Sequence, residues 1–245
     1  MALCQVRFFS QSLGKASEMI AVLPDAGDGP FPVLYLLHGL SDDASIWLRR
    51  SRIEWYVRDL PLIVVMPDGG RGWYTNALNG DAYEDHIVKD VIGQTERIFP
   101  ASWKRQHRAI AGLSMGGYGA MSLALHHPDL FVAAASLSGA VGIGHKPITD
   151  AMPLDFKRIF GENPEGSDKD LFTLIQKVHK AQLPALWLDC GVEDFLIEDN
   201  RAFHAHLQSL DVPHIYHEFP GAHTWDYWDE HIQEVLQFVI EHMKG

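Results

Sequence analysis

The stretch HRAIAGLSMGGYGAMSLAL, residues 107–125, decides the fold of this chain. Its first five residues have the pattern of a strand and its last seven that of a helix. Between them, Gly112, Ser114 and Gly116 make the pattern G-x-S-x-G, which is typical of a serine on a sharp strand-to-helix turn. Side chains in place of the two glycines would collide with the neighbouring strand and helix. The pattern predicts that Ser114 is a covalent nucleophile; the alternative is a glycine-rich turn with a helix-capping serine.

Strand-like and helix-like runs alternate along the chain from residue 33 onward. Continuous apolar runs, such as residues 33–37, are typical of strands buried on both faces of a parallel sheet. The alternation predicts an α/β fold with right-handed crossovers and a mostly parallel sheet covered by helices on both faces. We expect strands at 3–9, 17–23, 33–37, 62–66, 107–111, 131–137, 185–190 and 215–219, and helices at 44–60, 82–99, 119–125, 200–210 and 230–243.

Residues 138–184 interrupt this rhythm. The segment is rich in Gly, Pro and Asp, with short helical patterns only near 153–160 and 168–180. Two interpretations stay open, a cap over the pocket or an ordinary surface excursion. The chain has no internal repeat and no clear linker, so we expect a single domain spanning residues 1–245, with 138–184 as an insertion.

Composition limits the classes of function. The net charge is -12 and the pI about 5.5, which argues against nucleic-acid binding and against an anionic membrane surface. Cys4 and Cys190 match no metal or redox spacing, and two free thiols are the expected state. The N-terminus has no secretion pattern, and no apolar run approaches the roughly 20 residues of a membrane span. We therefore expect a cytoplasmic protein without a membrane partner.

A nucleophilic serine needs a base, and the base needs an orienting acid. In the α/β-hydrolase arrangement, these follow in the chain order Ser, Asp or Glu, His, on loops beyond the carboxyl ends of strands. Asp194 lies in the loop after strand 185–190 and is the predicted acid, with Glu193 as a near rival. His223 follows the last strand and a Pro-Gly turn, and it is the predicted base. Asp189 lies inside its strand and is expected to be structural.

Acyl transfer also needs hydrogen-bond donors for an oxyanion. The backbone N–H of Met115, directly after the nucleophile, is one predicted donor, and that of Leu40, after strand 33–37, is the other. Trp73 and Tyr74 follow strand 62–66, where they either wall a substrate pocket or simply pack. We expect no metal site, because the histidine after His217-Glu218 stands six positions on rather than four.

Five motifs in this order resemble the esterase D group of α/β-hydrolases, and the bacterial tributyrin-esterase type in particular. Related branches are S-formylglutathione hydrolases, feruloyl esterases and mycolyltransferases. The resemblance implies hydrolysis of short acyl or aryl esters, without a cofactor, by a cytoplasmic enzyme that forms dimers or tetramers. Carried over by motif, it also implies a triad of Ser114, Asp194 and His223. The motifs are His38-Gly39-Leu40, Met66-Pro67-Asp68-Gly69-Gly70, the run Gly112 to Ala120, Cys190-Gly191 with Glu193-Asp194-Phe195, and the run Pro220 to Trp225.

One motif departs from a related branch. The loop His38-Gly39-Leu40-Ser41-Asp42-Asp43 differs from the Ser-Gly-Leu-Thr-Cys type that S-formylglutathione hydrolases tend to carry. The sequence thus favours a serine carboxylesterase that hydrolyses short acyl or aryl esters through an acyl-enzyme. A thioesterase of the S-formylglutathione hydrolase kind and a non-catalytic α/β-hydrolase that serves as a ligand receptor are the alternatives.

Overall fold

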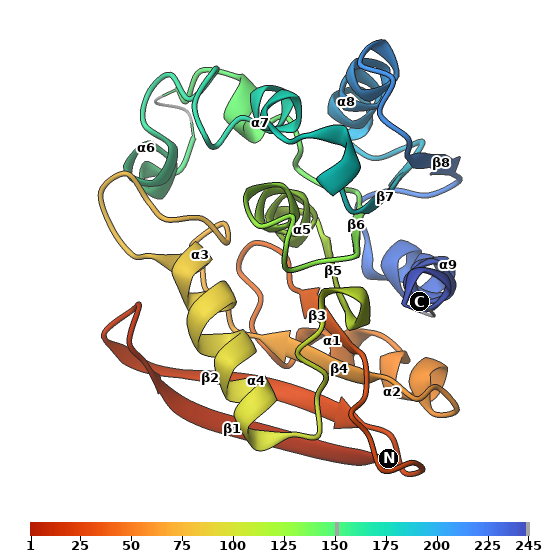
Figure 1. Ribbon diagram of the computed structural model, residues 1–245. Helices are drawn as coiled ribbons and strands as arrows, with labels where there is room; N and C mark the ends of the chain where they lie inside the picture. Colours follow the sequence, from red (N-terminus) through yellow and green to blue (C-terminus); the bar gives the residue numbers. More distant parts are fainter. Residues whose placement is uncertain (150–151, 244–245) are drawn as a thin grey trace.

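The computed structural model describes residues 1–149 and 152–243, and one eight-stranded sheet runs through them (Figure 1). The strand order is β1-β2-β4-β3-β5-β6-β7-β8. The pairs β1–β2 and β2–β4 are antiparallel, and the other neighbours are parallel. The mostly parallel sheet is confirmed. The strands are β1 (Ala2–Ser10), β2 (Lys15–Leu23), β3 (Val33–Leu37), β4 (Ile63–Pro67), β5 (Arg108–Leu113), β6 (Ala133–Leu137), β7 (Ala185–Gly191) and β8 (Ile215–Phe219).

Helices cover both faces of the sheet, so the apolar core has two parts. On one face pack α4 (Ile92–Ile98), α5 (Met115–His126), α7 (Leu171–Lys177) and α8 (Ile197–Ser209). On the other pack α1 (Ile46–Arg50), α2 (Ile53–Val57) and α9 (Trp225–His242). Helix α5 is buried from Met115 to Leu125, which explains why its sequence lacks a polar face. The remaining elements are α3 (Tyr83–Asp85), α6 (Leu154–Phe160), the π-helical turn η1 (His86–Val91) and the 3-10 turns η2 (Arg105–His107), η3 (Ile143–His145) and η4 (Lys180–Gln182).

All five predicted helices differ in their bounds from the observed ones. Helices α5 and α8 begin four and three residues before the predicted starts at 119 and 200, and the other three differ more. The helix expected at 44–60 is broken into α1 and α2, because the Ser51 side chain accepts the Ile53 N–H and Asp229 of α9 accepts the Arg52 N–H at 2.7 Å. The helix expected at 82–99 contains a π-helical turn, η1. Helix α9 begins at Trp225, five residues before the predicted start at 230.

Segment 138–184 packs against the body of the protein. The Tyr118 hydroxyl on α5 donates to the Lys169 carbonyl at 2.9 Å. The Trp73 ring lies edge-on against Phe156 and Phe160 of α6. Residues 150–151 of the segment lie outside the described part of the chain. Within the described residues, no helix combines the length and the apolar character needed to span a bilayer.

A buried carboxyl group lies in β7. The Asp189 side chain accepts hydrogen bonds from Trp187 Nε1 at 2.7 Å and from the Tyr227 hydroxyl at 2.9 Å. Burial disfavours the charged carboxylate and outweighs these two donors, so the pKa of Asp189 rises to about 7. Asp189 has the structural position that the sequence predicted.

We predict that Asp189 makes stability depend on pH. A folded-state pKa above the unfolded one means that its contribution to the free energy of unfolding is complete below about pH 4 and is lost as the pH rises through about 7. In urea unfolding from pH 4 to 8, the free energy of unfolding of Asp189→Asn should therefore rise relative to that of the wild type as the pH rises. Asp59→Asn, at an exposed carboxylate, is the control. A difference between Asp189→Asn and wild type that stays constant over this range would contradict the assignment.

Candidate active site

Ser114 lies on the turn between β5 and α5 and has the strained backbone angles φ 54° and ψ -115°. A Cβ atom at Gly112 would lie 2.4 Å from the Gly116 carbonyl oxygen, and one at Gly116 would lie 2.7 Å from the carbonyl oxygens of Leu37 and His38. Both positions therefore require glycine, as the sequence predicted. The close approach brings the start of α5 against the end of β3.

The loops that follow β7 and β8 lie against each other. A Cβ atom at Gly191 would lie 2.2 Å from the Gly221 carbonyl oxygen, and the Glu193 N–H donates to that same oxygen at 3.0 Å. The Glu193 carboxylate reaches across the loop and accepts the Gly221 N–H. These contacts place Asp194, on the β7 side, beside His223, on the β8 side.

Three side chains meet at the carboxyl edge of the sheet. His223 Nε2 lies 3.0 Å from Ser114 Oγ, and His223 Nδ1 lies 2.7 Å from Asp194 Oδ2. The Asp194 side chain is fully buried. Burial raises its pKa, but hydrogen bonds from His223 and from the Leu196 N–H outweigh burial and hold the pKa below the usual range. A charged Asp194 orients the ring with Nδ1–H toward itself, which leaves Nε2 free to accept the hydroxyl proton of Ser114.

The structure brings Asp194 to His223, whereas the contact that Glu193 makes is with the backbone of Gly221. Two aromatic rings flank the imidazole. Trp228 of α9 lies edge-on at 4.8 Å between ring centroids and is buried, as expected of a core residue. Phe195 lies at 4.5 Å and is 77% exposed. The sequence places Phe195 in the motif of the acid but assigns it no role; its apolar side chain directly after the acid, in a surface loop, is the signal that could have marked it.

The two predicted oxyanion donors belong to the start of α5 and to the loop after β3. Met115 opens α5, so its N–H has no acceptor within that helix and points out of the positive helix end. Leu40 lies in the loop after β3, and a Cβ atom at the preceding Gly39 would lie 3.7 Å from Ser114 Cβ. The loop after β3 therefore lies against the serine side chain.

Trp73 and Tyr74 pack against α5, where Trp73 contacts the Tyr118 ring and Tyr74 lies close to Gly119. Trp73 is 4% exposed and Tyr74 is fully buried. The Tyr74 hydroxyl accepts a hydrogen bond from the His38 N–H and donates one to the His38 carbonyl. Burial favours packing, one of the two roles that the sequence left open, over direct contact with a substrate.

The cluster of Ser114, Asp194 and His223 does not lie in the large surface hollow of the protein. A hollow of about 580 Å³ lies between α2 and α9, and its lining, which includes Trp55 and Gln237, contains none of the three side chains that meet at the sheet edge. Within residues 1–149 and 152–243, no group of three or more His, Cys, Asp or Glu side chains is arranged to hold a metal ion.

The sheet order and the strained serine turn define an α/β-hydrolase. The family model described as "Putative esterase" matches residues 10–239, and the chain belongs to this esterase family. An acetyl esterase of Caldicellulosiruptor saccharolyticus is 32% identical over 98% of both chains. The fluorophosphonate-binding serine hydrolase F of Staphylococcus aureus is 32% identical with a TM-score of 0.87, and an S-formylglutathione hydrolase of that organism is 31% identical with the same TM-score. Each of these two matches covers 98% of the present chain and 98% of the matched chain.

The protein is thus a serine hydrolase of carboxylic esters, a carboxylesterase. The resemblance to α/β-hydrolase esterases that the motifs indicated is confirmed.

The contact between the two loops yields a stability prediction. Gly191→Ala would drive a Cβ atom into a backbone carbonyl, which has little room to move. We expect it to lower the free energy of unfolding by about 1–3 kcal/mol. Gly93→Ala, on the open face of α4, is the matched control and should raise it by about 0.5–1 kcal/mol. Denaturant unfolding of both variants measures the effect, and equal stabilities would show that the loops are not in contact.

Proposed function

We propose that Ser114, His223 and Asp194 are the nucleophile, the base and the orienting acid of this carboxylesterase. The observation that carries the proposal is the pair of contacts at 3.0 Å and 2.7 Å that joins the three side chains through one imidazole. The arrangement meets the geometric requirement for general-base activation of a hydroxyl. It also argues against a non-catalytic receptor, which has no need of an oriented base.

In the proposed reaction, Ser114 Oγ attacks the ester carbonyl carbon while His223 Nε2 takes the hydroxyl proton. The backbone N–H groups of Leu40 and Met115 stabilise the negative charge that forms on the carbonyl oxygen. The tetrahedral intermediate expels the alcohol, which receives its proton from His223, and leaves an acyl-enzyme. His223 then deprotonates a water molecule that releases the acid and restores Ser114. Asp194 remains charged and stabilises the imidazolium.

For the substrate, we propose short acyl or aryl esters. Similarity to an acetyl esterase along 98% of both chains supports a small acyl group. A thioesterase of the S-formylglutathione hydrolase kind is the second candidate, because a hydrolase of that name is 31% identical with a TM-score of 0.87. The departure at residues 38–43 favours the ester. Turnover of S-formylglutathione compared with that of p-nitrophenyl acetate distinguishes the two.

We further propose that residues 1–245 form one domain in which 138–184 caps the site. The contacts of this segment with α5 and Trp73 support that arrangement. A cytoplasmic location, a dimeric or tetrameric state and the lack of a nucleic-acid partner remain predictions from the sequence.

Replacing the nucleophile tests the proposed function. We expect Ser114→Ala to lower kcat for p-nitrophenyl acetate by at least about 10³-fold, because no other group on this turn can form the acyl-enzyme. A fluorophosphonate probe should label the wild type and fail to label this variant. Ser209→Ala, at an exposed serine on α8, is the control and should keep both turnover and labelling. Ser114→Ala with wild-type turnover and intact circular dichroism would rule the nucleophile out.

Two neighbouring carboxylates test the acid. Asp194→Asn should lower kcat by about 10³–10⁴-fold, because the amide no longer holds His223 in the tautomer that accepts the serine proton. Glu193→Gln should keep kcat within about threefold, because its amide oxygen can still accept the Gly221 N–H. Steady-state kinetics with p-nitrophenyl acetate measures both. Equal losses in the two variants would remove the distinction between these carboxyl groups.

A further inference from the structure

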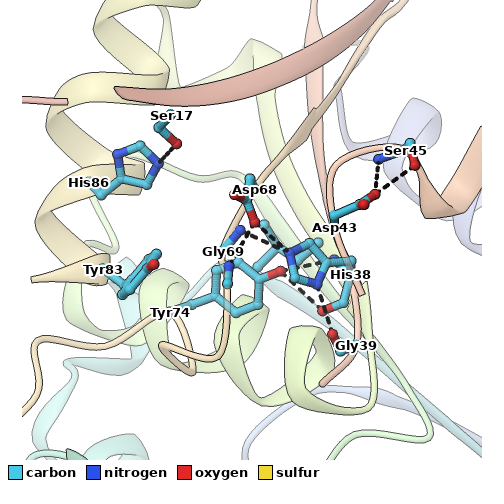
Figure 2. A network of polar contacts seen from close by, with 12 residues as sticks. Ser17, His38, Gly39, Asp43, Ser45, Asp68, Gly69, Tyr74, Tyr83 and His86 are labelled. Atoms are coloured by element: carbon cyan, nitrogen blue, oxygen red, sulfur yellow. Dashed lines mark hydrogen bonds and ion pairs between the residues drawn. The ribbon is translucent and has the colours of Figure 1, made fainter. Parts of the chain in front are cut away.

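The loop that carries the Leu40 N–H is held by a buried polar network. Its centre is His38, which is 1% exposed and has both ring nitrogens in contact with backbone groups (Figure 2). His38 Nδ1 lies 2.7 Å from the Gly39 carbonyl oxygen. His38 Nε2 lies 2.9 Å from the backbone nitrogen of Gly69, in the loop after β4. The ring thus joins the loops after two neighbouring parallel strands.

The contacts of the ring determine its tautomer. A backbone N–H can only donate, so His38 Nε2 must accept from Gly69. A neutral imidazole carries one proton, which therefore lies on Nδ1 and is donated to the Gly39 carbonyl. Asp68 Oδ1 stands 3.6 Å from Nε2, too far for a hydrogen bond. The hydrogen bond from the Gly69 N–H therefore fixes the Nδ1–H tautomer of His38, which is the tautomer that can donate to the Gly39 carbonyl.

Holding the Gly39 carbonyl fixes the direction of the Leu40 N–H. The two groups belong to the same peptide unit, and in a planar trans peptide the C=O and N–H bonds point in opposite directions. The Gly39 carbonyl accepts from His38 Nδ1 at 2.7 Å and from the Asp42 N–H at 3.3 Å. Because the Gly39 oxygen points toward His38 and the Asp42 N–H, the Leu40 N–H points away from them.

Tyr74 holds the preceding peptide units. Its hydroxyl accepts the His38 N–H and donates to the His38 carbonyl, both at 3.0 Å (Figure 2). The ring itself is fixed, because Cβ atoms at Gly69 and Gly119 would lie 2.2 Å and 2.4 Å from its atoms. One hydroxyl thereby bridges the N–H and C=O of a single residue and limits rotation of the backbone at His38. Packing alone does not need both of these hydrogen bonds.

We propose that His38 and Tyr74 are positioning residues of the oxyanion hole, which hold the Gly39–Leu40 peptide with its N–H directed at the developing oxyanion. This inference deepens the proposed function and rests on it. Neither side chain touches the substrate in this arrangement; each acts through the backbone. Their effect should therefore appear in the transition state and not in the binding of the ester.

Three substitutions at His38 separate its two contacts. His38→Asn keeps an N–H donor near the position of Nδ1, His38→Gln keeps an acceptor near Nε2, and His38→Leu has neither. With p-nitrophenyl acetate, we expect His38→Leu to lower kcat by about 10²-fold, the scale of losing one oxyanion donor, with KM within about threefold. His38→Asn should recover most of this loss and His38→Gln little of it. Gln recovering as well as Asn would overturn the proposal.

Tyr74→Phe is the second, smaller change, which removes one oxygen atom and keeps the ring packing. We expect kcat to fall about tenfold with KM unchanged, because the donor is then held less tightly in place. A boronic acid that forms a tetrahedral adduct with serine, such as phenylboronic acid, is the second readout. Its inhibition constant should rise in parallel with the loss of kcat across the His38 and Tyr74 variants, as expected of a transition-state analogue.

Folded His38→Leu and Tyr74→Phe proteins with wild-type kcat and wild-type boronate affinity would overturn the inference. So would a loss confined to KM or to thermal stability. These results differ from a failure of the proposed function, which would appear as wild-type hydrolysis that survives Ser114→Ala. Hydrolysis that needs Ser114 but ignores His38 and Tyr74 leaves the esterase mechanism intact and removes only the positioning role.

Discussion

The site depends on one close approach between backbones. Gly116, at the start of α5, comes so near the carbonyl groups of Leu37 and His38 that its Cβ atom would lie 2.7 Å from both oxygens. This approach puts the serine turn against the loop after β3, which carries the proposed donor at Leu40. A side chain at position 116 would push the serine turn away from the loop after β3. The proposed nucleophile would then move away from the proposed donor at Leu40.

Two aspartates of one strand and its following loop show how environment sets the role of a carboxyl group. Asp189 and Asp194 are both buried, and burial raises the pKa of each. For Asp189 burial prevails and the pKa rises to about 7, so the group is a structural acceptor for two donors. For Asp194 the hydrogen bonds from His223 and the Leu196 N–H prevail and the pKa falls. Only Asp194 stays charged across the neutral range, as its proposed role of orienting His223 requires.

Features set by local pattern were predictable from the sequence, and features set by distant contacts were not. Strand β3 has the predicted bounds because five consecutive apolar residues suit a strand covered on both faces. The break between α1 and α2 depends in part on the hydrogen bond from the Arg52 N–H to Asp229, 177 positions further along the chain, and no local pattern predicts that contact. At the site, the motif order pointed to Ser114, Asp194 and His223, which lie in contact. The hydrogen bonds of the Tyr74 hydroxyl depend on how two loops pack together, which the sequence does not show. The sequence therefore left the role of Tyr74 undecided.

The network around the oxyanion loop also reaches the 138–184 segment. Arg71 donates to the Ser41 hydroxyl at 2.9 Å and to Asp155 of α6 at 2.7 Å, which ties the loop after β3 to that segment. Trp73, next to Tyr74, packs on two phenylalanines of α6. The proposed donor at Leu40 is therefore held through His38, through Tyr74 and through these contacts with α6. Donors held by the protein's own groups do not have to reorganise when charge develops on the substrate, and this is the condition under which a hydrogen bond lowers a barrier most.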